Sequence, residues 1–314
     1  MVKLDTLGEY DHYFTIFIPT HNRAYVLNET FKSIESLTFK DFEVLIVDDG
    51  STDGTRELAE SWRSKAPFPV KYVYKTNGGK CSAHNTALKY ASGFLFFPVD
   101  AGDLVLPEAL NGIKDEWEKI PQDVRENFAG LCGLCLKDDG NISGAPFTRD
   151  SIDSDFNEIY SKSVMKNEKR WAMRLSVFKE YPYPTFEGEK YLRPTLILRR
   201  LSHRYKLRFI NVPLMIERQE PDGIRSNEFW HNYNSPKGQR LYFLEEVTLN
   251  DRYHGLKKSY RLNVHYIRFS LHSGVSILSQ SKEVKHRFVW ILAIPRGYVR
   301  WMKDLLKAKV SRPQ

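Results

Sequence analysis

The fold is decided by one stretch of the sequence, Val47-Asp48-Asp49-Gly50-Ser51-Thr52-Asp53. Residues 42–47, which lead into it, are apolar and β-branched, as in a strand buried on both faces. Residues 52–62 have a helical pattern, for which Ser51 and Thr52 are suitable N-cap residues. Acidic side chains at the carboxyl end of such a strand lie where open α/β sheets bind ligands. The stretch therefore predicts a strand, a turn and a helix, with either a ligand site or a simple helix cap in the turn.

The same alternation of strand and helix runs through the first half of the chain. Further runs of strand length lie at residues 14–18, 70–74 and 94–97. Residues 26–37 and 81–91 have helical patterns. Strands that alternate with helices through short links form parallel sheets covered by helices. We therefore expect an α/β fold with a mostly parallel sheet and helices on both faces.

The pattern is weaker after residue 129. Three more strands and one helix are expected, at residues 130–136, 175–178 and 207–216 and at residues 194–205. Further on, apolar residues recur at helical spacing: Tyr260, Val264, Ile267, Leu271, Val275 and Leu278. The last part of the chain is therefore expected to be mainly α-helical.

Charge separates the two parts of the chain. The net charge of the 314 residues is +8, and residues 231–314 carry 16 Lys and Arg against 5 Asp and Glu. The attraction for anions therefore belongs to the C-terminal segment. The sequence predicts two domains, an α/β catalytic domain over residues 1–226 and a basic, amphipathic helical region over residues 227–314.

Composition excludes several classes of protein. A hydrophobic content of 41% and a charged content of 27% rule out a disordered chain, a collagen-like repeat and a polytopic membrane protein. The three cysteines cannot build a disulfide framework, which favours a reducing compartment. Residues 1–11 contain no apolar segment of the kind found in a signal peptide. These features predict a cytoplasmic protein.

Three further polar clusters are expected at the same edge of the sheet as Asp48. They are Pro19-Thr20-His21-Asn22-Arg23, Asn77-Gly78-Gly79-Lys80 with Asn85, and Asp100-Ala101-Gly102-Asp103. The first and last follow predicted strands and the second opens a predicted helix. Because the carboxyl ends of parallel strands meet at one edge, these clusters should converge where a nucleotide would bind. Their order and spacing together are more specific than any one cluster.

From Phe14 to Leu106 the sequence resembles the inverting family 2 glycosyltransferases, which have the GT-A fold, and weaker similarity extends to about Ser226. The resemblance implies a base pocket flanked by the first cluster and a uridine-binding segment in which Asp48 faces the base. The implied nucleotide-binding residues are Pro19, Thr20, Asn22, Arg23, Asp48, Asp49 and Gly50. Lys80 and Asn85 match the region that closes over the ribose and the diphosphate.

The resemblance also implies a divalent metal, Mn²⁺ or Mg²⁺, at Asp100 and Asp103. A leaving nucleoside diphosphate is multiply charged, so cations at the diphosphate stabilise the transition state, and Lys80 or Arg23 could assist as fixed charges. The family usually has Asp-x-Asp-Asp here, but Gly102 replaces its second motif carboxylate. Either Asp103 substitutes for it, or one carboxylate, the diphosphate and water hold the metal, or Asp103 is only a turn residue. Weak metal binding is one expected outcome.

An inverting transfer needs a general base near the acceptor hydroxyl. Residues 186–191 resemble a segment of a bacterial branch of the family, which implies Glu189 as the base and Glu187 as the second candidate. A solvated loop carboxylate is the alternative. That branch usually has an acidic residue at the position of Arg193, so we expect a different acceptor pocket here. Arg225 lies in a segment that resembles the loop closing over the diphosphate, and is a candidate phosphate contact or simply a surface arginine.

The C-terminal segment combines apolar and basic residues. The apolar run 288–294 is far shorter than the ~20 residues that span a bilayer. Basic residues follow, interleaved with Tyr, Trp, Met and Leu: Arg296, Arg300, Lys303, Lys307 and Lys309. This pattern suits an anionic membrane surface, and the alternative is a helical cap over the catalytic domain. No nucleic-acid motif accompanies the charge, so no nucleic acid partner is expected.

The sequence therefore predicts a metal-assisted, inverting glycosyltransferase. It would move a sugar from a nucleotide-sugar, expected to be UDP-linked, to a hydroxyl of a glycan or lipid-linked acceptor in bacterial surface polysaccharide synthesis. It would be peripheral on the cytoplasmic face of the membrane. Two alternatives are a nucleotidyltransferase that uses a nucleoside triphosphate and a non-catalytic basic membrane adaptor.

Overall fold

The computed structural model describes residues 7–161, 169–218 and 227–310 and divides into two compact units. The first unit comprises Met1–Tyr183 and Ile197–Pro221, and the second comprises Pro184–Leu196 and Asp222–Gln314. The second unit thus takes a short segment from within the predicted catalytic domain. The domain boundary at residue 226 stays a prediction.

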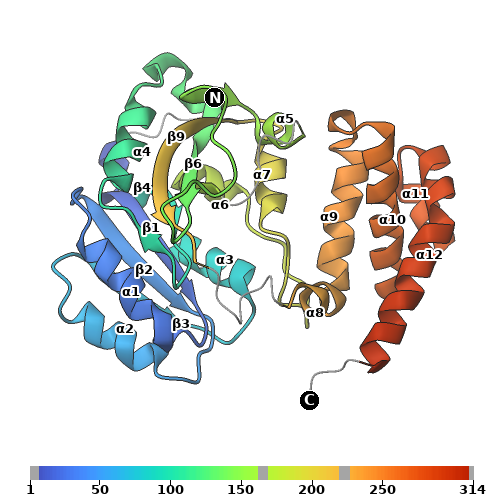
Figure 1. Ribbon diagram of the computed structural model, residues 1–314, viewed down its shortest axis with the longest axis horizontal. Helices are drawn as coiled ribbons and strands as arrows, with labels where there is room; N and C mark the ends of the chain where they lie inside the picture. The colour runs from blue at the N-terminus through green and yellow to red at the C-terminus, as the bar shows by residue number, and fades with distance from the viewer. Residues whose placement is uncertain (1–6, 162–168, 219–226, 311–314) are drawn as a thin grey trace. The chain divides into compact units, whose positions relative to one another are not determined.

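The first unit contains the predicted parallel strands, in the spatial order β3-β2-β1-β4 (Figure 1). Their bounds are β1 His12–Thr20, β2 Phe42–Asp48, β3 Val70–Tyr74 and β4 Gly93–Pro98. The register pairs Thr20 with Asp48, and Asp48 with Tyr74. The carboxyl ends of these strands therefore lie side by side, as expected for continuous apolar runs joined by helices.

Helices cover both faces of this sheet, as predicted. The first group is α1 Ala24–Glu35, α2 Thr55–Arg63 and α4 Ala109–Glu118, and the second is α3 Lys80–Tyr90 and α6 Leu175–Glu180. Alternation along β1 shows the two faces, because successive side chains point to opposite sides. Ile16 and Ile18 share a core with Phe31 of α1, whereas Phe17 packs against His84 of α3.

The sheet continues through strands of both directions, and the described part of the chain contributes nine strands to it. The remaining strands are β5 Leu104–Val105, β6 Phe128–Leu136, β7 Ser151–Ser154, β8 Lys169–Arg174 and β9 Lys206–Ile216. Strand β8 is antiparallel to both of its neighbours, β4 and β6, whereas β6 and β9 are parallel. The α/β fold class is confirmed. The sequence did not predict β8.

Two local predictions are wrong. Residues 175–178 form the start of α6 rather than a strand, and the strand β8 ends just before them at Arg174. An apolar run this short has no periodicity that distinguishes a helix from a strand. Helix α2 has Gly54 as its N-cap, not Ser51 or Thr52. The N–H groups of Ser51 and Thr52 are instead held by Asp48 and Asn22, which keeps both residues in the turn.

The second unit is mainly helical, in agreement with the apolar pattern. Its helices are α8 Glu228–Tyr233, α9 Pro236–Thr248, α10 Leu256–His272, α11 Ile277–Glu283 and α12 Arg287–Val310. The apolar stripe predicted over residues 260–278 is divided between α10 and α11. Helix α12 packs closely on α10 at Gly297, where a Cβ atom would lie 2.6 Å from Ile267. Over the described ranges, no helix has the length and apolarity that a membrane span requires.

Three short helical turns and two short helices complete the described structure. They are η1 Leu7–Glu9, η2 Gln122–Asn127, η3 Asp251–Tyr253, α5 Phe156–Ser161 and α7 Thr195–Leu201. Helix α7 corresponds to the helix predicted over residues 194–205 and is shorter at both ends.

Candidate functional site

The loops that follow β1 and β2 are tied together by Asn22. Its N–H donates to Oγ of Ser51 at 2.9 Å, and its Oδ1 accepts from the N–H of Thr52 at 2.8 Å. Asn22 has a φ of 52°, a left-handed conformation that Asn adopts more readily than most residues. The first two predicted clusters therefore meet at the edge of the sheet.

Asp48 is fully buried at the end of β2. Its Oδ1 accepts from the N–H of Ser51 at 2.8 Å, and its Oδ2 accepts from the hydroxyl of Tyr72 at 2.7 Å. Burial, and then the Asp48 carboxylate, raise the pKa of Tyr72, so the phenol stays a donor. Both Asp48 oxygens thus have partners in the protein, and its predicted contact with the base stays a prediction.

Asp49 organises the glycine loop before α3. Its carboxylate accepts from the N–H of Gly78 at 3.0 Å and of Gly79 at 2.6 Å, and Nζ of Lys75 lies 2.5 Å away. Gly50 has a φ of 84°, and a Cβ atom there would lie 2.8 Å from the backbone N of Asn77. These contacts bring the loop after β2 against the start of α3.

The end of β1 and the loop that follows it contain three more of the predicted residues, Pro19, Thr20 and Arg23. Pro19 pairs with Val47 between β1 and β2, and the carbonyl of Thr20 accepts from the N–H of Asp49 at 2.8 Å. Oγ1 of Thr20 is buried and has no partner among the described residues. Nη1 of Arg23 donates to the hydroxyl of Tyr25 at 2.8 Å. Pro19 and Thr20 therefore lie at the edge of the sheet, and the nucleotide contacts predicted for them and for Arg23 stay predictions.

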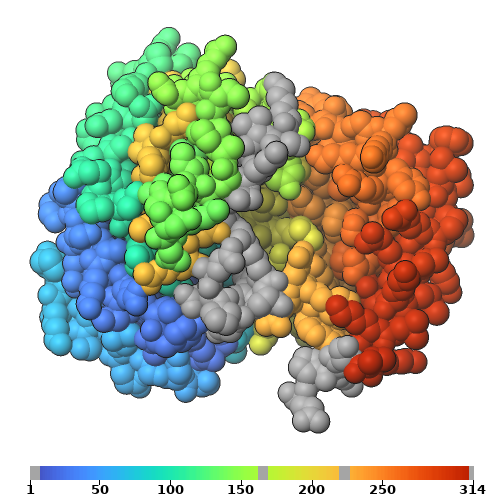
Figure 2. All heavy atoms as spheres, viewed as in Figure 1, coloured from blue at the N-terminus to red at the C-terminus, as the bar shows by residue number. Residues whose placement is uncertain are grey.

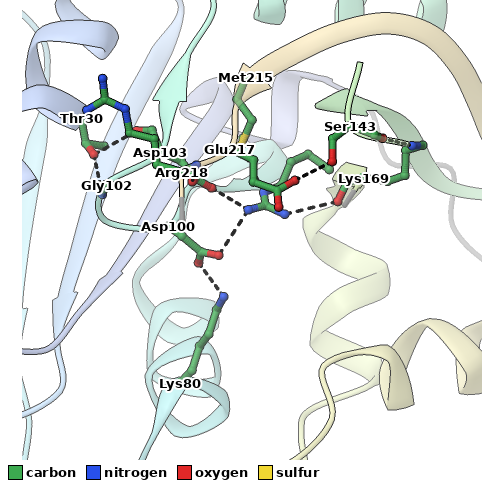
Figure 3. Close-up of polar contacts among 11 residues, drawn as sticks. Thr30, Lys80, Asp100, Gly102, Asp103, Ser143, Lys169, Met215, Glu217 and Arg218 are labelled. Carbon is green, nitrogen blue, oxygen red and sulfur yellow. Dashed lines mark hydrogen bonds and ion pairs between the residues drawn. The ribbon is translucent and has the colours of Figure 1, made fainter. Parts of the chain in front are cut away.

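Lys80 and Asp100 join α3 to the loop after β4 (Figure 3). Nζ of Lys80 lies 2.5 Å from Oδ1 of Asp100. Nη2 of Arg170, from β8, lies 3.4 Å from Oδ2 of Asp100 and 2.5 Å from Oδ2 of Asp103. The last oxygen, Oδ1 of Asp103, accepts from the N–H of Arg218 at 3.0 Å. All four predicted clusters are therefore connected, and Arg170 is an additional member that the sequence did not predict.

The electrostatics of the two carboxyl groups differ. Burial alone would raise the pKa of Asp100, but the positive charges of Lys80 and Arg170 outweigh it and lower the pKa to about 2. Burial dominates at Asp103, and the charge on Asp100 adds to it, so the pKa of Asp103 is raised despite Arg170. Asp100 is thus held as an anion by two cations.

These side chains, as they are placed, do not fit a divalent metal ion. Mg²⁺ and Mn²⁺ take several oxygen ligands, and here every oxygen of Asp100 and Asp103 already has a cationic or N–H partner. Within residues 7–161, 169–218 and 227–310, no three His, Cys, Asp or Glu side chains are grouped to hold a metal. Gly102 adds no carboxylate; its φ is 110° and its N–H donates to Oγ1 of Thr30 at 2.9 Å.

Asn85 has a backbone partner within the first unit. Its Nδ2 donates to the carbonyl of Tyr183 at 2.8 Å, and its Oδ1 accepts from the N–H of Tyr183 at 2.8 Å. This reciprocal pair fixes the aromatic segment at the end of the unit. The predicted role of Asn85 at the ribose and diphosphate stays a prediction.

The candidate bases lie in the second unit. The carboxylate of Glu189 accepts from the N–H groups of Lys237 and Gly238, each at 2.8 Å, and so caps the first turn of α9. Glu187 is exposed in the same loop. Nε of Arg193 donates to Oε1 of Gln239 at 2.9 Å. Arg225 lies outside the described residues, so its predicted phosphate contact stays a prediction.

Residues 15–125 match glycosyl transferase family 2, the segment that contains β1 to α4 and the four predicted clusters. Over these residues the match confirms the resemblance to family 2 glycosyltransferases found in the sequence. The match covers the four polar clusters and includes neither Arg170 nor Glu189.

Curated relatives share this part of the chain. One is GalNAc(5)-diNAcBac-PP-undecaprenol beta-1,3-glucosyltransferase of Campylobacter jejuni, 28% identical over 173 residues, which are 49% of this chain and 53% of that protein. Another is poly(ribitol-phosphate) beta-N-acetylglucosaminyltransferase TarS of Staphylococcus aureus, 34% identical over 99 residues, 31% of this chain and 17% of that protein. The matches thus span about half or less of these relatives.

Solved structures show the fold. The crystal structure of S. aureus TarS 1–349 in complex with UDP-GlcNAc has a TM-score of 0.57 and 20% identity, and covers 90% of this chain and 80% of that one. Mannosyltransferase PcManGT from Pyrobaculum calidifontis, in complex with GDP-Man and Mn²⁺, has a TM-score of 0.54 and 17% identity, and covers 97% of this chain and 89% of that one. The predicted GT-A fold is confirmed.

Proposed function

We propose that this protein transfers a sugar from a nucleotide-sugar, UDP-linked, to a hydroxyl group of a glycan or lipid-linked acceptor. The observation that carries the proposal is the chain of contacts from Asn22 through Asp49 to Lys80 and Asp100. It places polar backbone and side-chain groups from four segments at the carboxyl edge of the sheet, the position at which α/β sheets bind nucleotides. These segments lie within the family 2 match.

The proposed reaction is a single displacement with inversion, as the family resemblance implies. The acceptor oxygen forms a bond to the anomeric carbon while the bond from that carbon to the β-phosphate oxygen breaks. The bonding electrons go to the phosphate oxygen, and the hydroxyl proton goes to Glu189, with Glu187 as the second candidate. Glu189 must exchange at least one of its α9 N–H partners for the acceptor hydroxyl.

The names of relatives support a polymer or lipid-linked acceptor. One acts on an undecaprenol-linked glycan and another on poly(ribitol-phosphate). We therefore place the proposed reaction in bacterial surface polysaccharide synthesis. The cytoplasmic location stays a prediction from the sequence, as does the divalent metal.

The proposal is tested by supplying the full chain with a panel of nucleotide-sugars and candidate acceptors and identifying the product. A glycosyltransferase releases a nucleoside diphosphate, whereas a nucleotidyltransferase releases pyrophosphate from a triphosphate. Glu189→Gln should abolish transfer, because it removes the group that accepts the hydroxyl proton. It should leave UDP binding unchanged within about threefold, because Glu189 is not proposed to contact the nucleotide. Binding of vesicles without any nucleotide affinity would instead support the membrane adaptor.

We also propose that α12 holds the protein on an anionic membrane surface. Its exposed apolar residues recur at helical spacing: Phe288, Ile291, Leu292, Tyr298, Val299, Met302 and Leu306. A hollow of about 560 Å³ beside this stripe is lined by Arg268, Arg296, Arg300 and Lys303 together with Asp304. Apolar side chains flanked by cations suit the boundary between acyl chains and phosphate headgroups. Figure 2 shows α12, in red, at the surface of the second unit.

A further inference from the structure

Two protein cations occupy the place at which the family resemblance puts a metal ion. Lys80 and Arg170 contact three of the four carboxylate oxygens of Asp100 and Asp103, and the N–H of Arg218 contacts the fourth. The two positive charges balance the two carboxylates. The cluster is therefore complete without a third cation.

The backbone around the cluster disfavours a metal-binding side chain at position 102, where Gly102 replaces the second carboxylate of the family motif. Gly102 has a φ of 110°, in the region that favours glycine over residues with a side chain. Its N–H is fixed by the hydroxyl of Thr30, which also donates to the carbonyl of Asp103 at 2.9 Å. The side chain of Asp103 is only 5% exposed, and it faces Arg170 and the backbone of Arg218. Neither position presents a free carboxylate to the edge of the sheet.

Lys80 and Arg170 differ in what they can do for a bound diphosphate. The side chains of Lys80 and Asp100 are each 37% exposed, so Lys80 can rotate from Asp100 to a phosphate oxygen. Arg170 is 12% exposed and is anchored on two carboxylates, so its charge is fixed beside them. Lys80 is also the first residue of α3, whose backbone dipole favours an anion at that end.

We infer that Lys80 and Arg170 form a cationic diphosphate-binding site that takes the place of a divalent metal ion. The inference rests on the proposed nucleotide-sugar donor. When the bond between the anomeric carbon and the β-phosphate oxygen breaks, the electron pair adds negative charge to the diphosphate. Lys80 binds that oxygen and Arg170 supplies a fixed positive charge, which stabilises the leaving group without bound metal. Nucleotide binding and transfer are then independent of Mn²⁺ and Mg²⁺.

The test is calorimetric titration of the full chain with UDP and with uridine, in EDTA and in Mn²⁺. The expected result is that UDP binds in EDTA within about threefold of its affinity in Mn²⁺. UDP binding that requires Mn²⁺ would overturn the inference and leave the proposed function standing. If neither UDP nor uridine binds under either condition, the UDP-linked donor of the proposed function is wrong instead.

Substitutions assign the effect to the two cations. Lys80→Met and Arg170→Met should each weaken UDP binding in EDTA by about tenfold or more, and leave uridine binding unchanged. Arg170→Lys keeps the positive charge, so it should lower UDP affinity less than Arg170→Met does.

The control is Lys89→Met. Lys89 is an exposed lysine at the other end of α3, the helix that begins at Lys80, and its substitution should not change UDP affinity. Thermal unfolding identifies any variant that has lost its fold, and Lys80→Met, at a half-exposed position, keeps the test valid if Arg170→Met unfolds. Unchanged UDP affinity in a folded Lys80→Met would contradict the inference.

Discussion

Nη2 of Arg170 lies 2.5 Å from Oδ2 of Asp103, and both side chains are nearly buried. The pair connects the antiparallel strand β8 to the loop that follows the parallel strand β4. Asp103 also accepts from the backbone N–H of Arg218, just after β9. A single carboxylate therefore joins three segments of the first unit, and its charge is compensated inside the protein.

Replacing Asp103 by Asn should destabilise the first unit, because Arg170 would remain buried with less compensating charge. We expect a loss of about 3 kcal/mol in the free energy of unfolding, measured by urea titration. The control is Glu118→Gln, which breaks the exposed pair of Lys114 and Glu118 on α4 and should cost no more than about 0.5 kcal/mol. Equal effects of the two substitutions would show that the Arg170–Asp103 pair does not stabilise the fold.

Asp49 should act on nucleotide affinity through the glycine loop. It holds the N–H groups of Gly78 and Gly79 and the ammonium group of Lys75. Asp49→Ala removes these contacts, so we expect both a lower melting temperature and about tenfold weaker UDP binding by calorimetry. Asp41→Ala, at an exposed position before β2, is the control. Weaker binding with an unchanged melting temperature would instead indicate a direct contact between Asp49 and the nucleotide.

The parallel part of the fold was predictable because its strands are continuous apolar runs. Strands β1, β2 and β4 are buried on both faces, so their composition alone separates them from the amphipathic helices between them. The antiparallel part gave no such signal. Strand β7 is polar, and β8 contains three basic residues within six. The strand predicted over residues 175–178 was wrong because this apolar run has the composition of a strand but lies in helix α6.

The same difference applies to the site. Asp48, Asp49 and Asp100 were predictable because each follows a parallel strand, and strand ends meet at one edge. Arg170 was not, because its contact with Asp100 joins residues 70 positions apart through a strand whose neighbours the sequence did not reveal. The resemblance implied Asn22 as a base-pocket residue and Glu189 as the general base. Their hydrogen bonds to the turn after β2 and to the start of α9 were not predictable, because they depend on packing that no local pattern encodes.

Stability should depend on pH through Glu43, a buried residue of β2. Its Oε1 accepts from the hydroxyl of Thr15 and the N–H of Ser92, each at 2.7 Å, and Nζ of Lys71 lies 2.8 Å from its Oε2. Burial alone would raise the pKa of Glu43, but these partners outweigh it, so the pKa in the folded state is lowered. The stabilisation is then complete above the ordinary pKa of glutamate, about 4.3, and is lost as the pH falls through the lower folded value.

Glu43→Gln should therefore reduce the free energy of unfolding by about 2 kcal/mol at neutral pH. The difference from the unsubstituted protein should decrease as the pH falls below about 4. Urea titrations at several pH values measure it. Glu57→Gln, on the exposed face of α2, should show no such dependence. A difference that stays constant between neutral and acidic pH would mean that Glu43 acts through packing alone and not through its charge.

Helix α12 should bind anionic membranes through one face while the other face packs inside the second unit. Trp290 and Ala293 are buried, and Gly297 lies against α10, whereas Leu292 and Leu306 are 55% and 59% exposed. Deleting α12 would therefore disturb the unit as well as the surface. The double substitution Leu292→Ser with Leu306→Ser leaves the packed face intact and should lower affinity for vesicles of phosphatidylglycerol and phosphatidylcholine by about tenfold or more.

Vesicle sedimentation measures this change, and thermal unfolding should show a nearly unchanged melting temperature. Leu256→Ser, at an exposed leucine on α10, is the matched control and should bind vesicles like the unsubstituted protein. Vesicles of phosphatidylcholine alone should bind more weakly, because the cations around the stripe then lack anionic headgroups. If the double substitution leaves binding to anionic vesicles unchanged, the apolar stripe is not a membrane contact, and α12 is only the helical cap that the sequence offered as the alternative.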